Sequence, residues 1–161
     1  MLKLSRVTQA EFKREPVDLS RMAREIAKHL RQDNPDRIVD LAIQENVVVQ
    51  GDRRLLQIAM MNLMDNAFKF TGPREHARIQ FGATVGETET ICFIRDNGGG
   101  FDMAYEGKLF GPFQRLHREE EFPGTGIGLA TVRRIVSRHG GQVWAEGEVG
   151  KGATFYFTLE N

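Results

Sequence analysis

The 161-residue chain suits one domain with a substantial core, and a second complete domain would be cramped. It carries 22 basic and 22 acidic residues, so its formal net charge is zero. Nucleic-acid and anionic-membrane surfaces need a clustered positive excess, so we expect no nucleic-acid partner and no direct membrane contact. The single cysteine, Cys92, excludes an internal disulfide and fits a reducing, cytoplasmic compartment.

Residues 1–16 differ from the rest of the chain because they form no closed pattern of their own. Leu2 and Leu4 fit the end of a helix whose partner face lies elsewhere, and Pro16 interrupts this pattern. The first residues lack the apolar stretch of a secretory signal, and no apolar run approaches the length of a membrane span. We therefore separate this leading segment from a domain over 17–161.

The rest of the chain alternates helical and strand patterns. Its apolar spacing predicts helices over 19–32, 53–70 and 128–138. Asp18 and Asp52 are placed to cap the first two of these helices. Apolar and β-branched runs predict strands over 37–43, 47–50, 77–84, 90–96, 142–147 and 153–159. This order predicts an α/β two-layer sandwich, with helices on one face of a mixed sheet.

Two asparagines interrupt the apolar pattern of the second predicted helix. Asn62 and Asn66 are four residues apart, so they project from the same side, with Lys69 about one turn further on. Taken alone, this pattern favours a solvated stripe on an amphipathic helix. The functional alternative is a cation–phosphate site, because amide oxygens are hard, neutral ligands for Mg²⁺ and a lysine can neutralise phosphate charge.

A carboxylate and a glycine turn follow the predicted strand over 90–96. Asp96 ends this strand, so a rigid element would hold its carboxylate at the edge of the sheet. A carboxylate accepts hydrogen bonds, so it can pair with the exocyclic amine of adenine and reject guanine, which offers a carbonyl there. Gly98–Gly100 is in isolation an ordinary flexible turn, but glycines also let the backbone approach a flat ring.

A second glycine-rich segment, Gly124–Gly128, opens the third predicted helix. Such a turn presents backbone N–H groups and the positive end of the helix dipole to phosphates. A lone pattern of this kind is weak evidence. It is not a Walker loop, because no Gly-Lys-Ser/Thr follows, and it is not a dinucleotide-binding fingerprint, because 101–123 precedes it in place of a strand.

Five segments resemble, in the same order, the sequence boxes of the histidine kinase family. The N box, first glycine box, F box, second glycine box and last glycine box correspond to Asn62–Thr71, Asp96–Gly100, Leu109–Phe113, Gly124–Ala130 and Gly150–Phe155. Each match is modest alone, but together they span about residues 52–159. The stretch over 113–129 is most similar to phytochrome- and PAS-linked sensor kinases.

The resemblance implies a Bergerat-type α/β sandwich with a mostly antiparallel sheet, which binds ATP and Mg²⁺. Asn66 would coordinate Mg²⁺ with support from Asn62, and Lys69 would contact a phosphate. Asp96 would hold the adenine amine, partly through water shared with Thr154. Further implied contacts with ATP are Gly98, Gly100, Phe113, Thr125, Gly126, Gly128 and Leu129, with Arg115 reaching the γ-phosphate.

Asn62 also separates kinases from hydrolases within this resemblance. Hydrolysing relatives carry a glutamate there that activates water as a general base, whereas an amide accepts no proton. We therefore expect slow hydrolysis, while positioning and charge neutralisation, which supply most of phosphoryl-transfer catalysis, remain. The resemblance implies a protein-histidine kinase domain with an ATP lid over about 101–123, in which Phe110 packs against the core.

None of the histidines His29, His76, His117 and His139 has the acidic neighbour and the proline or asparagine of a phosphoacceptor motif. We expect His29 and His139 at the surface of helices. We expect residues 1–16 to be the end of a dimerisation helix and its linker, with the acceptor histidine upstream. The implied partners are that dimerisation domain, in a homodimeric parent, and the receiver domain of a response regulator.

Two other interpretations stay open. A stand-alone serine kinase of the anti-sigma-factor type has the same fold and also lacks the helical hairpin. A nucleotide-binding docking module without activity would carry a broken box, and no box is broken here. On the first interpretation, the chain binds ATP with Mg²⁺ and phosphorylates itself negligibly.

Overall fold

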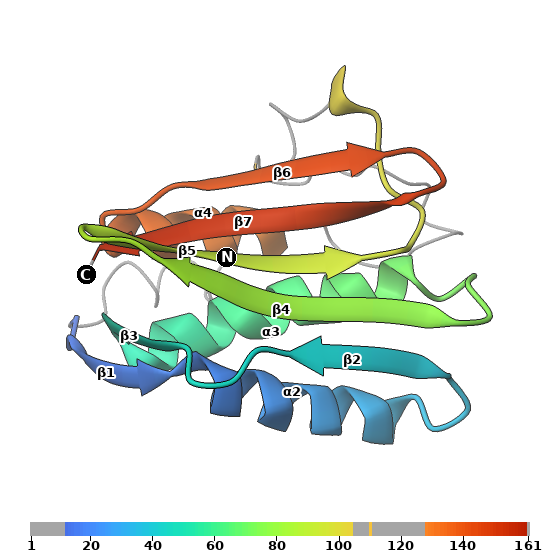
Figure 1. Cartoon of the computed structure of the whole chain (residues 1–161), viewed down its shortest axis with the longest axis horizontal. Helices are drawn as coiled ribbons and strands as arrows, with labels where there is room; N and C mark the ends of the chain where they lie inside the picture. Colours follow the sequence, from blue (N-terminus) through green and yellow to red (C-terminus); the bar gives the residue numbers. More distant parts are fainter. Residues whose placement is uncertain (1–11, 105–109, 111–127, 161) are drawn as a thin grey trace.

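The computed structural model describes residues 12–104, 110 and 128–160, which form two layers (Figure 1). One layer holds the helices α2 (Leu19–Asp33), α3 (Arg53–Phe70) and α4 (Gly128–Arg138). The other is a sheet in the order β2-β4-β5-β7-β6. Its strands are β2 (Val39–Ile43), β4 (Ala77–Val85), β5 (Glu89–Asp96), β7 (Gly152–Glu160) and β6 (Val143–Glu148).

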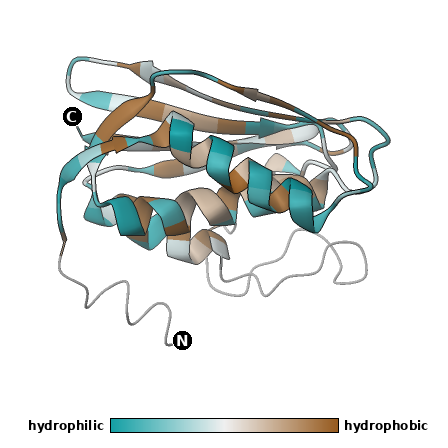
Figure 2. Ribbon diagram, turned by 90° about the horizontal axis from the view of Figure 1, so that it is seen from below, coloured by the Kyte–Doolittle hydropathy of each residue, from teal (hydrophilic) through white to brown (hydrophobic). Residues whose placement is uncertain are grey.

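The sheet confirms the predicted fold class. β2 runs parallel to β4, and the other neighbouring pairs are antiparallel, so the sheet is mixed and mostly antiparallel. The helices lie on one face of it, and Figure 2 shows hydrophilic residues over much of their outer surface. Among the described helices, none is both long and apolar enough to cross a membrane.

A second, two-stranded sheet was not predicted. β1 (Glu15–Asp18) pairs antiparallel with β3 (Val48–Gly51), so the predicted boundary between residues 16 and 17 falls inside β1. The sequence does not reveal β1, because four residues are too few for a periodic pattern and Pro16 argues against a strand. Proline is tolerated there because β1 pairs on one side only.

Asp18 and Asp52 cap α2 and α3 as predicted. The Asp18 carboxylate accepts a hydrogen bond from the Arg21 backbone N–H at 2.9 Å, and the Asp52 carboxylate accepts one from the Leu55 N–H at 3.1 Å. Each cap satisfies a helix donor that has no partner within the helix, and such a bond contributes about 1 kcal/mol.

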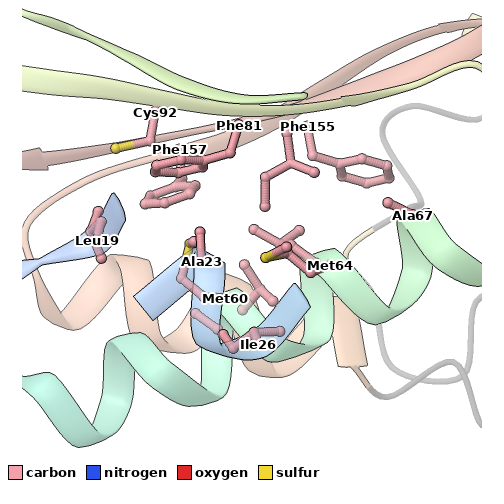
Figure 3. Close-up of a cluster of buried hydrophobic side chains, with 14 of the residues drawn as sticks. Leu19, Ala23, Ile26, Met60, Met64, Ala67, Phe81, Cys92, Phe155 and Phe157 are labelled. Atoms are coloured by element: carbon pink, nitrogen blue, oxygen red, sulfur yellow. The ribbon is translucent and has the colours of Figure 1, made fainter. Parts of the chain in front are cut away.

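The hydrophobic core lies between the sheet and the helices, as Figure 3 shows. Phe81, Phe155 and Phe157 point from the sheet toward Met60 and Met64 of α3, and all five side chains are buried. Each such burial contributes about 1.5–3 kcal/mol, so the rotation of α3 about its axis is fixed by this contact. The polar side of α3 must then face away from the sheet.

Cys92 is a core residue of β5, as predicted. It is a free cysteine, and burial raises the pKa of its thiol to about 12. The thiol therefore stays protonated at neutral pH and packs as a small apolar group.

The prediction that His139 lies at the surface is wrong, because the residue is only 1% exposed. Its Nε2 accepts the Asp52 backbone N–H at 3.0 Å, and its Nδ1 lies 2.8 Å from the Ile135 carbonyl oxygen. These two bonds require a neutral ring with the proton on Nδ1. The Phe12 ring packs against the imidazole, with 4.7 Å between the ring centroids. His139 thus joins the end of α4 to the start of α3.

The surroundings of His139 disfavour its charged form. Burial lowers the pKa of the imidazole, and the hydrogen bond to the Ile135 carbonyl opposes this effect. Arg14 and Arg138 lower the pKa further, whereas Asp52 raises it, and the net shift is downward. The unfolded chain therefore binds a proton near pH 6 that the folded chain excludes.

We expect His139 to make the free energy of unfolding decrease as the pH falls from 7.5 toward 5.5, through the ordinary histidine pKa of about 6.5. His139→Gln keeps an acceptor but does not titrate. The stability of the wild type relative to this variant should fall with decreasing pH, by at most about 1.4 kcal/mol per unit for one proton. Urea unfolding at each pH measures this difference.

The control for this experiment is His29→Gln, because His29 is exposed on α2. This variant shows how the loss of a histidine at an exposed position changes the stability at each pH. A pH-independent difference between the wild type and His139→Gln would contradict the neutral, buried imidazole.

Candidate functional site

Asp96 lies at the end of β5 and is buried, with 5% of its surface exposed. Its Oδ1 accepts the Gly98 backbone N–H at 2.8 Å. Burial raises the pKa of the carboxyl to about 6, and the backbone N–H groups of Gly98 and Ala153 oppose this effect. A buried carboxylate at a fixed position is therefore available as a hydrogen-bond acceptor at neutral pH.

The glycine turn after Asp96 is packed tightly against other backbone segments. A Cβ on Gly98 would overlap the Phe70 carbonyl, and one on Gly100, whose φ is +66°, would overlap the Glu148 carbonyl. The Gly99 N–H donates to the Phe70 carbonyl at 3.2 Å. These glycines therefore allow close contact with other backbone segments of the protein. The sequence pattern predicts close contact with a ligand ring instead.

The last glycine box supports the first. Gly152 has a φ of +124°, and a Cβ there would overlap the Asp96 carbonyl oxygen. The Gly150 N–H donates to the Gly99 carbonyl at 2.8 Å. Segments that lie far apart in the sequence thus hold one turn at the end of the sheet.

Thr154 does not lie on the same side of the sheet as Asp96. The register of β5 and β7 pairs Asp96 with Ala153 and Arg95 with Thr154. Because side chains alternate across a strand, Thr154 points to the opposite face, where its hydroxyl accepts a hydrogen bond from Arg95 Nε at 3.2 Å. The implied water shared between Asp96 and Thr154 does not fit this geometry, and Ala153 at the facing position has no hydroxyl.

Asn62, Asn66 and Lys69 are half-buried on α3. Asn62 faces the first turn of α4, since a Cβ on Gly128 would lie 3.3 Å from its Oδ1. In the part of the chain that the structure describes, no protein group hydrogen-bonds to either amide. Half-buried amide oxygens without a protein partner are available to water or to a hard cation.

Asp65 is a neighbour of this site that the sequence interpretation missed. Lys69 Nζ lies 3.0 Å from Asp65 Oδ2, and both side chains are more than a third exposed. The i,i+4 spacing of an acid and a base on one helix was the signal for this pair. Such an exposed pair contributes about 0–1 kcal/mol, so a phosphate can compete for the ammonium group.

Phe110 of the predicted F box packs against the core, as expected. It is buried, and its ring meets Phe155 edge-on with 6.1 Å between the centroids. Leu129 is also buried, in the first turn of α4. The predicted site residues Phe113, Arg115, Thr125 and Gly126 lie outside the described residues, as does most of the predicted lid over 101–123.

A sequence model for the family described as histidine kinase-, DNA gyrase B- and HSP90-like ATPase matches residues 51–161. The chain belongs to this ATPase family. The match covers the N box and every described glycine segment at the site, together with the whole of α3 and α4.

Curated relatives of this chain include histidine kinases and phytochromes. The methanogenesis regulatory histidine kinase FilI of Methanothrix harundinacea is 44% identical over 69% of this chain, which spans 12% of that protein. Cyanobacterial phytochrome A of Nostoc sp. is 43% identical over 70% of the chain, or 14% of that protein. The adaptive-response sensory kinase SasA of Thermosynechococcus vestitus is 37% identical over 70% of the chain, or 29% of that protein.

Solved structures have the same fold. Full-length ShkA, in a complex with AMPPNP, matches 98% of this chain with a TM-score of 0.77 and 26% identity, and the match covers 34% of ShkA. The mycobacterial sensor histidine kinase MprB matches 92% of this chain and 97% of that chain, with a TM-score of 0.75 and 24% identity.

The environment of Asp96 predicts an unusual titration. In carbon-detected NMR of the carboxyl group, we expect a midpoint near pH 6, because the buried carboxylate loses hydration. The Asp96→Asn spectrum assigns the signal. A midpoint at or below about 4, the ordinary aspartate value, would contradict the buried position.

Proposed function

We propose that this chain is the ATP-binding catalytic domain of a two-component sensor histidine kinase. It binds ATP with Mg²⁺ and donates the γ-phosphoryl group to a histidine on a dimerisation domain outside these 161 residues. The receiver domain of a response regulator then accepts the phosphoryl group, and the parent protein acts as a cytoplasmic or membrane-anchored homodimer. The observation that carries this proposal is the buried Asp96 carboxylate, fixed at the sheet end in a member of this ATPase family.

Asp96 supplies the adenine end of the proposed site. Its carboxylate accepts the hydrogen bond of the exocyclic amine, and the Gly98 N–H sets the direction of the carboxylate. Guanine would place a carbonyl oxygen against the same carboxylate, which leaves two buried acceptors facing each other. The site therefore favours adenine, because guanine would lose the hydrogen bond to the Asp96 carboxylate.

The second half of α3 and the first turn of α4 supply the part of the proposed site that holds the phosphates. Asn66 would hold Mg²⁺ through its amide oxygen with support from Asn62, and bound Mg²⁺ would neutralise phosphate charge. Lys69 exchanges its ion pair with Asp65 for a phosphate oxygen. Gly128 lies at the first turn of α4, where backbone N–H groups and the helix dipole favour an anion.

Asn62 makes the proposed site a poor hydrolase. Its amide lies against the start of α4, where the phosphates are placed, but an amide cannot take a proton from attacking water. Positioning and charge neutralisation remain for transfer to a histidine that another domain presents. A site that binds ATP but hydrolyses it slowly fits a kinase.

The adenine assignment predicts that Asp96→Asn lowers the affinity for ATP at least about tenfold. The amide offers the adenine amine a neutral acceptor in place of a charged one, and its own NH₂ group is a second donor at that position. Calorimetry with ATP and Mg²⁺ measures this loss. Wild-type affinity should also fall as the pH drops below about 6, where Asp96 becomes protonated. Asp40→Asn, the same change at an exposed position of β2, is the control and should bind normally.

Equal affinities of the wild type and Asp96→Asn would refute the adenine assignment. Equal affinities of the wild type for ATP and GTP would do the same, because the carboxylate should reject guanine.

The transfer reaction is tested with radiolabelled ATP. We expect the isolated chain to label itself negligibly, and acid-labile label to appear on the dimerisation domain of the parent when that domain is added. Asn66→Ala should reduce this labelling at least about a hundredfold, because the metal site loses its main ligand. Acid-stable label on serine would support the serine kinase instead, and a chain without nucleotide affinity would support the docking module.

A further inference from the structure

Arg74, in the connection between α3 and β4, bonds to three backbone carbonyls around the Asp96 turn. Its Nε donates to the Asn97 carbonyl at 2.8 Å, and its Nη2 donates to the Gly98 carbonyl at 3.2 Å and to the Gly150 carbonyl. In Figure 1 the α3–β4 connection, the end of β5 and the β6–β7 turn lie at the same end of the sheet, where the three carbonyls accept from Arg74.

We infer that Arg74 is a positioning residue, which holds the Asp96 carboxylate in the orientation that recognises adenine. The inference rests on the proposed ATP site. Asn97 and Gly98 directly follow Asp96, and the Gly98 N–H donates to the Asp96 carboxylate. Arg74 holds both residues by their carbonyl oxygens, so it acts on Asp96 through the backbone.

The pairing of β5 with β7 does not extend into this turn. The pairing of β5 with β7 ends at Asp96 and Ala153, so the following residues lie beyond the regular ladder. The bond from the Gly150 N–H to the Gly99 carbonyl and the Arg74 clamp then join the turn to the β6–β7 connection. A guanidinium suits this task because its five N–H donors form a rigid, planar fork.

The Asn97 side chain ties the same turn to the start of β4. Its Oδ1 accepts the Arg78 N–H at 2.8 Å, and its Nδ2 donates to the His76 carbonyl at 3.1 Å. The turn after Asp96 is therefore bonded to its neighbours in two ways. Arg74 donates to its carbonyl oxygens, and the Asn97 side chain bonds to the backbone of His76 and Arg78. Without Arg74, the Asn97 bonds remain, so the turn should shift without unfolding.

The test compares Arg74→Gln and Arg74→Lys with the wild type, and uses Arg24→Gln, an exposed arginine of α2, as the matched control. We expect Arg74→Gln to bind ATP and ADP about tenfold more weakly, because charged hydrogen bonds to the turn are lost. Arg74→Lys should recover only part of the lost affinity for ATP and ADP, since a point charge cannot bridge three carbonyls. The control should bind normally.

A second readout needs no nucleotide. In the free protein, Arg74→Gln should shift the Gly98 amide resonance and raise the titration midpoint of Asp96 above about 6, because the Gly98 N–H lowers it. Unchanged nucleotide affinity together with an unchanged Asp96 midpoint would overturn the role of Arg74 and leave the ATP site intact. If the wild type binds no adenine nucleotide, the proposed function fails, and the two NMR readouts still decide whether Arg74 orients Asp96.

Discussion

The burial of one side of α3 against the sheet is the constraint on which the site depends. Met60 and Met64 lie under Phe81 and Phe155, and a rotation that exposed them would cost several kcal/mol. With this side fixed, Asn62 of α3 faces the first turn of α4, and the last carbonyl of the helix reaches the glycine turn. One helix therefore positions both the adenine end and the phosphate end of the proposed site.

The first and last glycine boxes pack together through backbone contacts, although they lie far apart in the sequence. Gly98 and Gly100 leave room for the end of α3 and the end of β6, and Gly152 leaves room for the strand that carries Asp96. Backbone held this closely gives the carboxylate a fixed direction. A fixed direction suits the adenine recognition that we propose for Asp96, and an amide at Asn62, which is not a general base, suits the slow hydrolysis that we propose with it.

Local features of the fold could be predicted from the sequence, whereas features set by distant partners could not. The caps Asp18 and Asp52 signal the helix starts because a cap and its helix are contiguous. The face of Thr154 depends on the register of two strands that are 59 residues apart, and a one-residue difference reverses it. The burial of His139 and the clamp of Arg74 likewise depend on partners from other parts of the chain.

We propose that Asp96 binds the adenine amine while residues of α3 and the first turn of α4 hold the phosphates. A crystal structure of this chain with AMPPNP and Mg²⁺ tests it most directly. We expect the exocyclic amine of adenine within hydrogen-bond distance of the Asp96 carboxylate, and Mg²⁺ on the amide oxygen of Asn66. An adenine ring bound away from Asp96, with the nucleotide otherwise well ordered, would contradict the account.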